Sequence, residues 1–471
     1  MIRFQRTLNS LFCLFILALL ASLQCVHARA ERPNIILIFA DDLGWQEPAY
    51  AGSDFCKTPN LDRLAADGMV FRHAYASAGN CQPSRACMLS GQYTPRHDVY
   101  AVSSTKRGPV ELMRLLPIGN KGSLPMKTVA MGEAMKAAGY ATGLFGKCHL
   151  KDTADGKSER AGFDVVKVSQ HGLNSRNVAD PKGIFSITDA ACAFMEANRE
   201  RPFFAYVSHY AVHSRLQARP ETKARFTGKD PGDLGHGNPL FAACLAELDT
   251  GVGMIRDKLK ELDIEKNTLI VFTSDNGGTH VSQEPLRGKK GCYYEGGIRV
   301  PMIACWPGVV TPGSTCDVPV LNVDFYPTFL DAAGANRPSS PLDGTSLVPL
   351  LKGGTELDRE SIFWHFPGYL DRPVPRGRDP VFRTRPVSVI RKGDWKLHLY
   401  HEQWQLDGGR EKLDNNHAVE LYNLATDAGE RKDVALSQPE KRDELLADLL
   451  AWFERTQARL PSESNPQWRG K

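Results

Sequence analysis

The sequence predicts an α/β fold in two domains. The larger domain is a doubly wound, mixed or parallel sheet with helices on both faces. The smaller C-terminal α+β domain has an antiparallel sheet and a closing helix. Three observations predict this fold: continuous apolar runs that end in polar residues, amphipathic segments between those runs, and shorter alternating stretches after residue 355. We place the domains at residues 31–355 and 356–460, with a mobile polar tail at 461–471.

The first 30 residues are typical of a secretory signal peptide. Arg3 and Arg6 precede the apolar run LFCLFILALLASLQCV, and Ala28-Arg29-Ala30 provides the small residues of a cleavage site. The run is shorter than the ~20 residues that a membrane-spanning helix needs, and no later segment approaches that length. We therefore expect an exported protein, periplasmic or extracellular, with no membrane span.

The net charge argues against a nucleic-acid partner, and the number of cysteines limits the internal disulfides. The signal holds three of the 58 basic residues and none of the 54 acidic ones, so nothing in the nearly neutral mature chain suggests a nucleic-acid partner. Eleven cysteines include Cys13 and Cys25 in the signal, which leaves an odd number in the mature chain. At least one of them is therefore outside any internal disulfide.

Four apolar runs predict the central strands of the large sheet. Their continuous β-branched and aromatic composition is typical of strands that are buried on both faces. The runs are RPNIILIFADD (32–42), YATGLFGKCHL (140–150), PFFAYVSHYAVH (202–213) and NTLIVFTSDNGG (267–278). Apolar residues at spacings of three and four predict helices in TPNLDRLAADG (58–68), KTVAMGEAMKAAGY (127–140) and LFAACLAELDTGVGMIRDKLKEL (240–262).

After residue 355, the sequence changes to shorter stretches in which apolar and polar residues alternate. The stretches ESIFWHF (360–366), VSVIRKGDWKLHLY (387–400) and VELYNL (419–424) predict an antiparallel sheet. A closing helix is expected to begin at Ser437, with Glu440 completing a capping box, because a broad apolar face follows.

Acids and an amide follow two of the predicted strands. Asp41 and Asp42 end one run, and Asp275 and Asn276 end another. Ligands of such sheets gather outside the carboxyl ends of the strands, so the four side chains are expected in one crevice. Taken alone, each pair also suits a helix cap or a turn. Together, three carboxylates and an amide oxygen indicate a hard cation such as Ca²⁺ rather than zinc.

The stretch CQPSR, residues 81–85, places a cysteine beside a proline, a hydroxyl and an arginine. From spacing alone, Cys81 suits a small buried apolar residue and a nucleophile equally well. With LSG at 89–91, however, the stretch resembles the signature of the type I sulfatases, alkaline-phosphatase-like enzymes whose cysteine is oxidised to formylglycine (3-oxoalanine).

Five further segments are similar to segments of that family, in the same order along the mature chain. They are PNIILIFADDLGW, TPNLDRLAADGMVFRHAYA, TGLFGKCHL, TSDNGG and LRGKKGCYYEGGIRVP. Gln92, Cys148 and VHSR (212–215) depart from the residues that are common in the family. These departures bear on substrate fit and on maturation, and they leave the metal and nucleophile positions intact.

The resemblance implies roles for individual residues. One Ca²⁺ per chain would be held by Asp41, Asp42, residue 81, Asp275 and Asn276. Arg85 and Lys147 would steady the aldehyde hydrate, and His149 would assist its deprotonation. Lys290, with Lys289 as the alternative, would contact the sulfate, and His213 would protonate the leaving oxygen. Glu295 and Arg299 also match the family, and we interpret them as a buried structural pair.

The implied reaction uses the two hydroxyls of a hydrated aldehyde at position 81. One hydroxyl would attack sulfur in line and release the alcohol, and deprotonation of the other would then expel sulfate and regenerate the aldehyde. The resemblance also implies a partner during maturation, a formylglycine-generating enzyme that reads CQPSR in the unfolded chain.

Substrate recognition is predicted from the loop-rich C-terminal region. His365 in FWHFPGY and five arginines could line a cleft for an anionic sugar chain, with an ordinary solvated loop as the alternative. The arginines are Arg372, Arg376, Arg378, Arg383 and Arg385. The expected function is a sulfuric ester hydrolase that acts on a sulfated polysaccharide or oligosaccharide.

Two classes of alternative stay open. The first is an arylsulfatase, or a phosphate or phosphonate ester hydrolase of the same superfamily, although such phosphatases commonly have serine or threonine as the nucleophile and more histidines. The second is a non-catalytic glycan-binding protein, which predicts the loss of at least one site residue; the sequence retains them all.

Overall fold

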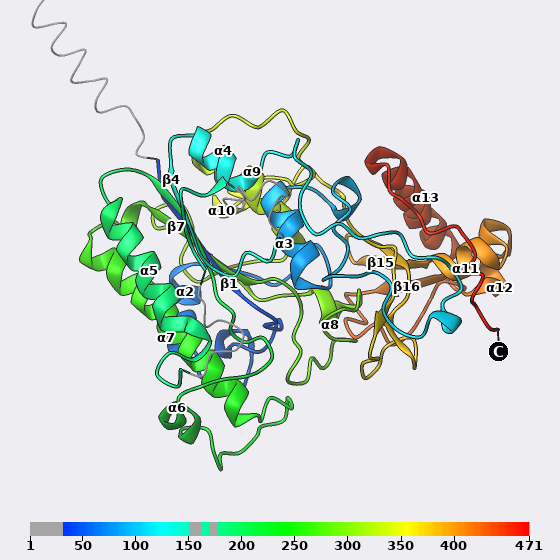
Figure 1. Ribbon diagram of the computed structural model, residues 1–471, viewed down its shortest axis with the longest axis horizontal. Coiled ribbons are helices and arrows are strands. Elements are labelled where there is room, and N and C mark those ends of the chain that lie inside the picture. The colour runs from blue at the N-terminus through cyan, green and yellow to red at the C-terminus, as the bar shows by residue number, and fades with distance from the viewer. Residues whose placement is uncertain (1–31, 151–161, 169–176, 471) are drawn as a thin grey trace, which may run out of the picture.

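The large sheet occupies the larger domain of the computed structural model, which describes residues 32–150, 162–168 and 177–470 (Figure 1). The predicted signal peptide lies outside the described residues. Eight strands are hydrogen-bonded in the order β5 (Val165–Lys167), β4 (Ala141–Gly146), β6 (Phe203–Ser208), β1 (Asn34–Ala40), β7 (Thr268–Ser274), β8 (Met302–Cys305), β2 (Met69–Phe71) and β9 (Ser314–Cys316). Within this order only β8 runs antiparallel to its neighbours. The four predicted strands are therefore confirmed as β1, β4, β6 and β7.

The register of the parallel strands aligns their carboxyl ends. Ser208 of β6 pairs with Gly146 of β4 and with Phe39 of β1, and Ala40 of β1 pairs with Ser274 of β7. The residues that follow these four strands therefore emerge at the same edge of the sheet.

Helices cover both faces of the sheet because alternate strand residues point to opposite sides. On one face, Ile36, Ile38 and Ala40 share a core with helices α2 (Pro59–Asp67), α5 (Ile184–Ala197) and α7 (Pro239–Glu261), and α7 also contacts α6 (Pro220–Ala224). On the other face, Ile35, Leu37 and Phe39 share a core with α3 (Cys81–Ser90), α4 (Met131–Ala137), α9 (Phe325–Ala332) and α10 (Val348–Leu351). Figure 1 shows these two layers on either side of β1 and β7.

A four-stranded antiparallel sheet forms the C-terminal domain. Its strands are β11 (Ser361–Phe366), β14 (Val387–Lys392), β15 (Trp395–Tyr400) and β16 (Val419–Asn423), and α13 (Pro439–Thr456) packs on them. Smaller elements are the pair β12 (Leu370–Asp371) and β13 (Phe382–Thr384), the pair β3 (Ala74–Tyr75) and β10 (Val320–Leu321), and helices α8 (Glu295–Ile298), α11 (His401–Leu406) and α12 (Leu413–Asn416). The predicted fold class is thus confirmed, whereas the boundary at residue 355 stays a prediction.

The closing helix begins later than predicted. Its N-cap is Gln438, no side chain caps it, and Pro439 occupies the first helical position. Proline suits that position because its φ is fixed and its missing N–H would have no partner there. The hydroxyl of Ser437 donates instead to the carbonyl of Val434 at 3.2 Å. The predicted capping box of Ser437 and Glu440 is therefore wrong.

The terminal segment packs against the rest of the chain. Asn465 is buried, and its Nδ2 donates to the carbonyl oxygens of Val110 and Met113 at 2.8 Å. Ser464 also forms a β-bridge with Leu115. These residues therefore have defined contacts with a neighbouring loop, whereas the mobility of the tail stays a prediction.

A buried ionic network joins α8 of the larger domain to the C-terminal domain. Lys396 of β15 contacts Glu295 at 2.8 Å and Glu430 at 3.0 Å, and all three side chains are at most 1 % exposed. Arg299 lies 3.7 Å from Glu295. Glu295 thus belongs to a structural group, as expected, although Lys396 rather than Arg299 is its close partner.

Replacing Lys396 by methionine is expected to destabilise the protein by about 3–5 kcal/mol, because two buried carboxylates lose their shared cation. Denaturant unfolding of Lys396→Met measures this loss. Lys432→Met, at an exposed position, is the matched control and should change stability by less than about 0.5 kcal/mol. Equal stabilities of the two variants would show that the network does not hold the domains together.

Candidate active site

Four buried polar residues lie directly after the central strands β1 and β7. Asp42 has a φ of 66°, and its backbone N–H donates to Asp275 Oδ1 at 3.1 Å. Asn276 Nδ2 donates to Asp42 Oδ1 at 2.9 Å. Asp41 lies beside Asp42, and all four residues are at most 1 % exposed. The structure therefore brings the four predicted metal ligands of the strand ends together.

Two buried oxygen atoms of this group, Asp41 Oδ1 and Asn276 Oδ1, have no hydrogen-bond partner among the described residues. Leaving a buried acceptor unsatisfied costs about 1–3 kcal/mol, so such atoms usually have a partner or a ligand. A divalent cation would satisfy both oxygens, and carboxylate and amide oxygens are the ligands that Ca²⁺ prefers. The donor set therefore fits an oxygen-ligated cation.

Cys81 of helix α3 also lies in this group. It is the first residue of α3 and is 2 % exposed. One ligand atom each from Asp41, Asp42, Cys81 and His213 lie within 4.8 Å of one another. Burial raises the pKa of the Cys81 thiol, against the opposing effect of Lys147 and Lys290. As a plain thiol, Cys81 would therefore be a poor nucleophile at neutral pH.

Arg85, one turn further along α3, is fully buried beneath this group. Its Nε donates to Asp275 Oδ2 at 2.8 Å, and its Nη2 lies 2.7 Å from the same oxygen, so the two side chains form a buried ion pair. Its Nη1 donates to Tyr206 Oη at 2.9 Å and to Ser208 Oγ. Arg85 therefore fixes the orientation of the Asp275 carboxylate and of the start of α3.

Two lysines balance the remaining carboxylates. Lys147 Nζ lies 2.5 Å from Asp41 Oδ2, and Lys290 Nζ lies 2.6 Å from Asp42 Oδ1. Burial opposes the charge on Lys290, but the nearby carboxylates, Asp42 first, raise its pKa above the usual range. Burial likewise opposes ionisation of Asp42, but Lys290 holds the pKa of that carboxyl below its usual value. Lys290 rather than Lys289 is thus the lysine that contacts this group.

Two histidines complete the site. His149 has a φ of 65°, and its buried Nδ1 has no hydrogen-bond partner in the part of the chain that the structure describes. Burial, aided by Lys147 and Arg85, lowers the pKa of His149 to about 3, so the ring is neutral at pH 7. His213 places Nε2 3.8 Å from Asp42 Oδ2, while its Nδ1 lies 2.6 Å from the carbonyl oxygen of Ser214. Both rings therefore have a nitrogen available for proton transfer.

His365 is not available to a substrate, contrary to the expectation from the sequence. It is 1 % exposed, its Nδ1 lies 2.7 Å from Ser388 Oγ, and its Nε2 lies 3.1 Å from the carbonyl oxygen of Arg459. Its ring also packs edge-on against Phe453 of α13. His365 is a core residue of the C-terminal domain.

The five candidate arginines divide into two groups. Arg378 pairs with Glu420 at 3.1 Å, Arg385 pairs with Asp379 at 2.5 Å, and Arg376 donates to the carbonyl of Leu286. Arg378 and Arg385 thus pair with acids of the C-terminal domain, and Arg376 joins that domain to the larger one. Arg372 and Arg383 have no such close carboxylate partner among the described residues.

Three contacts of the site were not predicted. Tyr206 and Ser208 hold Arg85, and Thr279 Oγ1 lies 3.4 Å from Asp42 Oδ2. Tyr206 and Ser208 are two residues apart on β6 and therefore face the same side of the sheet. Their polar side chains in an otherwise apolar run were the signal that could have identified them.

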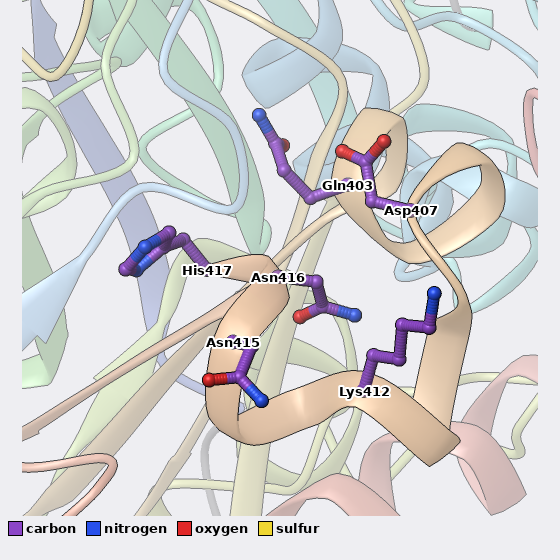
Figure 2. Close-up of a pocket in the computed structure, with 6 residues that line it drawn as sticks. All are labelled: Gln403, Asp407, Lys412, Asn415, Asn416 and His417. Atoms are coloured by element: carbon purple, nitrogen blue, oxygen red, sulfur yellow. The ribbon is translucent and has the colours of Figure 1, made fainter.

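A separate cavity of about 370 Å³ lies in the C-terminal domain (Figure 2). It is lined by Gln403, Asp407, Lys412, Asn415, Asn416 and His417. None of the predicted site residues lines it, and Figure 1 places α11 and α12 at the end of the molecule away from β1 and β7. It is therefore not part of the candidate active site.

Comparison with family models gives two matches that together cover most of the chain. Residues 33–335 match the sulfatase family model. Residues 288–458 match a model described as the C-terminal region of N-sulphoglucosamine sulphohydrolase. The first match includes every residue placed at the site above.

Similar proteins cover nearly the full length. The chain is 32% identical to a sulfatase of Formosa agariphila, over 92% of this chain and 90% of that protein. It is 31% identical to human arylsulfatase A, over 88% of this chain and 85% of that protein. Among solved structures, Ps i-CgsB in complex with k-i-k-neocarrahexaose superimposes with a TM-score of 0.70 at 28% identity, covering 92% of this chain and 95% of that one. From the match over most of its length and the agreement in fold, the chain belongs to the sulfatase family and is a sulfuric ester hydrolase.

Proposed function

We propose that the protein removes sulfate from a sulfated carbohydrate, with one Ca²⁺ per chain and with Cys81 converted to formylglycine. The observation that carries this proposal is the position of Cys81. It lies in one cluster with Asp41, Asp42 and His213, and three cationic side chains contact the carboxylates of the site. A sulfate monoester is anionic, so a site that cleaves it needs positive charge around the sulfate oxygens.

The cation would be held by Asp41, Asp42, residue 81, Asp275 and Asn276, whose unpaired oxygens support this assignment. When bound, the cation and the aldehyde hydrate at position 81 supply an acidified hydroxyl as the nucleophile. The protein's part is to hold these groups in place. Arg85 does so through its buried ion pair with Asp275.

The remaining residues bind the substrate and move protons. Lys290 and Lys147 place ammonium groups where they can neutralise sulfate oxygens. His149 is neutral at pH 7 and accepts a proton at its unpaired Nδ1. His213 faces the cluster with Nε2, from which it donates a proton to the leaving alcohol oxygen.

A carbohydrate substrate is supported by two of the relatives. The model that matches residues 288–458 is described for a sulphohydrolase of an amino sugar, N-sulphoglucosamine. Ps i-CgsB, whose fold matches along most of the chain, was solved with a neocarrahexaose. One is named for a sugar and the other was solved with one, so we infer that the substrate of this protein is a sulfated polysaccharide or oligosaccharide.

Maturation would precede folding. Every residue of α3, which contains CQPSR, is buried in the folded protein. A formylglycine-generating enzyme could therefore reach Cys81 only in the unfolded chain, and the predicted signal peptide would export the modified protein to the periplasm or the cell exterior. Within the described residues, no helix is both long enough and apolar enough to cross a membrane.

The function is tested with protein that was co-expressed with a formylglycine-generating enzyme and loaded with Ca²⁺. We expect it to hydrolyse an aryl sulfate faster than the matching aryl phosphate, to release sulfate from members of a sulfated-sugar panel, and to lose activity in EGTA. Faster turnover of the phosphate would contradict the assignment. Tight binding of sulfated sugars without any sulfate release would favour a glycan-binding protein.

A further inference from the structure

Three arginines lie close together beside the active site, and two of them share a single carboxylate. Arg107 Nη2 contacts Asp371 Oδ1 at 2.6 Å, and Arg372 Nε lies 3.7 Å from Asp371 Oδ2. Arg383 has no carboxylate within ion-pair distance among the described residues. This arginine cluster, Arg107, Arg372 and Arg383, therefore carries three positive charges against one negative charge.

Arg383 is held in a fixed orientation although it lacks a counter-ion. Its Nε donates to the carbonyl oxygen of Arg372 at 3.1 Å, and its Nη1 donates to that of Lys290 at 3.0 Å. Burial lowers the pKa of Arg383, and the charges of Arg107 and Arg372 lower it further. A preorganised guanidinium that lacks a counter-ion is a site that an anion would stabilise.

The cluster adjoins the residues that we assign to sulfate binding. Arg383 bonds to the backbone of Lys290, whose Nζ reaches the site. Its side chain passes over Gly291, where an added Cβ would lie only 2.4 Å from Arg383 Cδ. The N–H of Gly291 in turn donates at 2.7 Å to the carbonyl oxygen of Gly79, two residues before Cys81. An anion at this cluster would therefore lie next to the bound ester and not within it.

We propose that Arg107, Arg372 and Arg383 form a subsite for a second anionic group, a sulfate or a carboxylate, on the sugar next to the one that is desulfated. The proposal rests on the carbohydrate sulfatase function and narrows the substrate class to chains with repeated negative charge. The exposure of the cluster agrees with this role, because the side chains of Arg107 and Arg372 are 38% and 80% exposed.

Inhibition of aryl sulfate hydrolysis by three defined probes tests the subsite. Glucose 6-sulfate has one anionic group, sucrose octasulfate has sulfates on two sugars, and a monosulfated disaccharide with a uronic acid adds a carboxylate. In Arg383→Gln, the inhibition constant of sucrose octasulfate should rise about 10- to 100-fold, the effect of losing one charge-assisted contact. The constant of glucose 6-sulfate should change much less. A matching rise for the uronic acid probe would show that the subsite also takes carboxylates, and no rise would restrict it to sulfate.

If Arg383→Gln does not fold, Arg107→Gln takes its place in the same test. Arg63→Gln, at an exposed position on α2, is the control. Equal changes for glucose 6-sulfate and sucrose octasulfate, or none in either variant, would overturn the proposal. If the wild-type protein hydrolyses no sulfate ester, calorimetric binding of the same probes still tests the subsite. An inactive wild type would reject the proposed function, and the calorimetric comparison of the wild type with Arg383→Gln would then decide the subsite.

Discussion

Replacing Cys81 by serine is expected to reduce the turnover of an aryl sulfate by a factor on the order of 10³ or more. Serine offers one hydroxyl, whereas the proposed hydrate of formylglycine offers two, so serine cannot expel sulfate by the same route. The variant should release at most one equivalent of alcohol per chain. A stopped-flow or quenched assay at high enzyme concentration measures this amount.

Cys87 provides a matched control on the same helix. It is buried like Cys81, but its Sγ faces His97 Nε2 at 3.4 Å and not the carboxylates. Cys87→Ser should therefore retain activity within a few-fold of the wild type. Multiple turnover by Cys81→Ser, or an equal loss in both variants, would show that position 81 is not the nucleophile.

Asp275→Asn is expected to lower activity by about 10²-fold or more and to remove most of the stabilisation by Ca²⁺, because a charged ligand becomes neutral. The structure adds a second effect. Asp275 is the counter-ion of the fully buried Arg85, so the substitution should also cost about 3–5 kcal/mol of stability. Thermal unfolding with and without Ca²⁺ measures both effects.

The double variant Asp275→Asn, Arg85→Gln separates the two effects. It removes the stranded charge of Arg85, so part of the lost stability should return while activity stays low. Recovery of activity along with stability would mean that Asp275 only supports the fold. Wild-type turnover in Asp275→Asn would show that the metal site lies elsewhere.

The sequence predicted the site well where strands are buried on both faces. The runs that became β1, β4, β6 and β7 are continuous and apolar, so the polar residues after them had to lie at one edge of a parallel sheet. This reasoning located Asp41, Asp42, Asp275 and Asn276. Cys81 needed the resemblance to the sulfatases, because a cysteine at a helix start has no distinctive pattern.

The sequence did not predict the surroundings of His365 and of the arginines, because these surroundings depend on contacts between segments that are far apart in the chain. His365 lies in β11, where five successive residues are buried because α13 and the larger domain both pack on the C-terminal sheet. A local pattern cannot show that both faces are covered. The partners of the arginines depend likewise on pairing between β12 and β13 and on side chains about 20 to 40 residues away, such as Glu402 and Glu420.

Cys81 is proposed to be converted to formylglycine and to act as the nucleophile of a sulfatase. The most direct test is mass spectrometry of the tryptic peptide from His73 to Arg85, taken from mature, active protein that was co-expressed with a formylglycine-generating enzyme. We expect an aldehyde at position 81, in a fraction that rises with the specific activity on an aryl sulfate. An intact thiol in fully active protein would contradict the account.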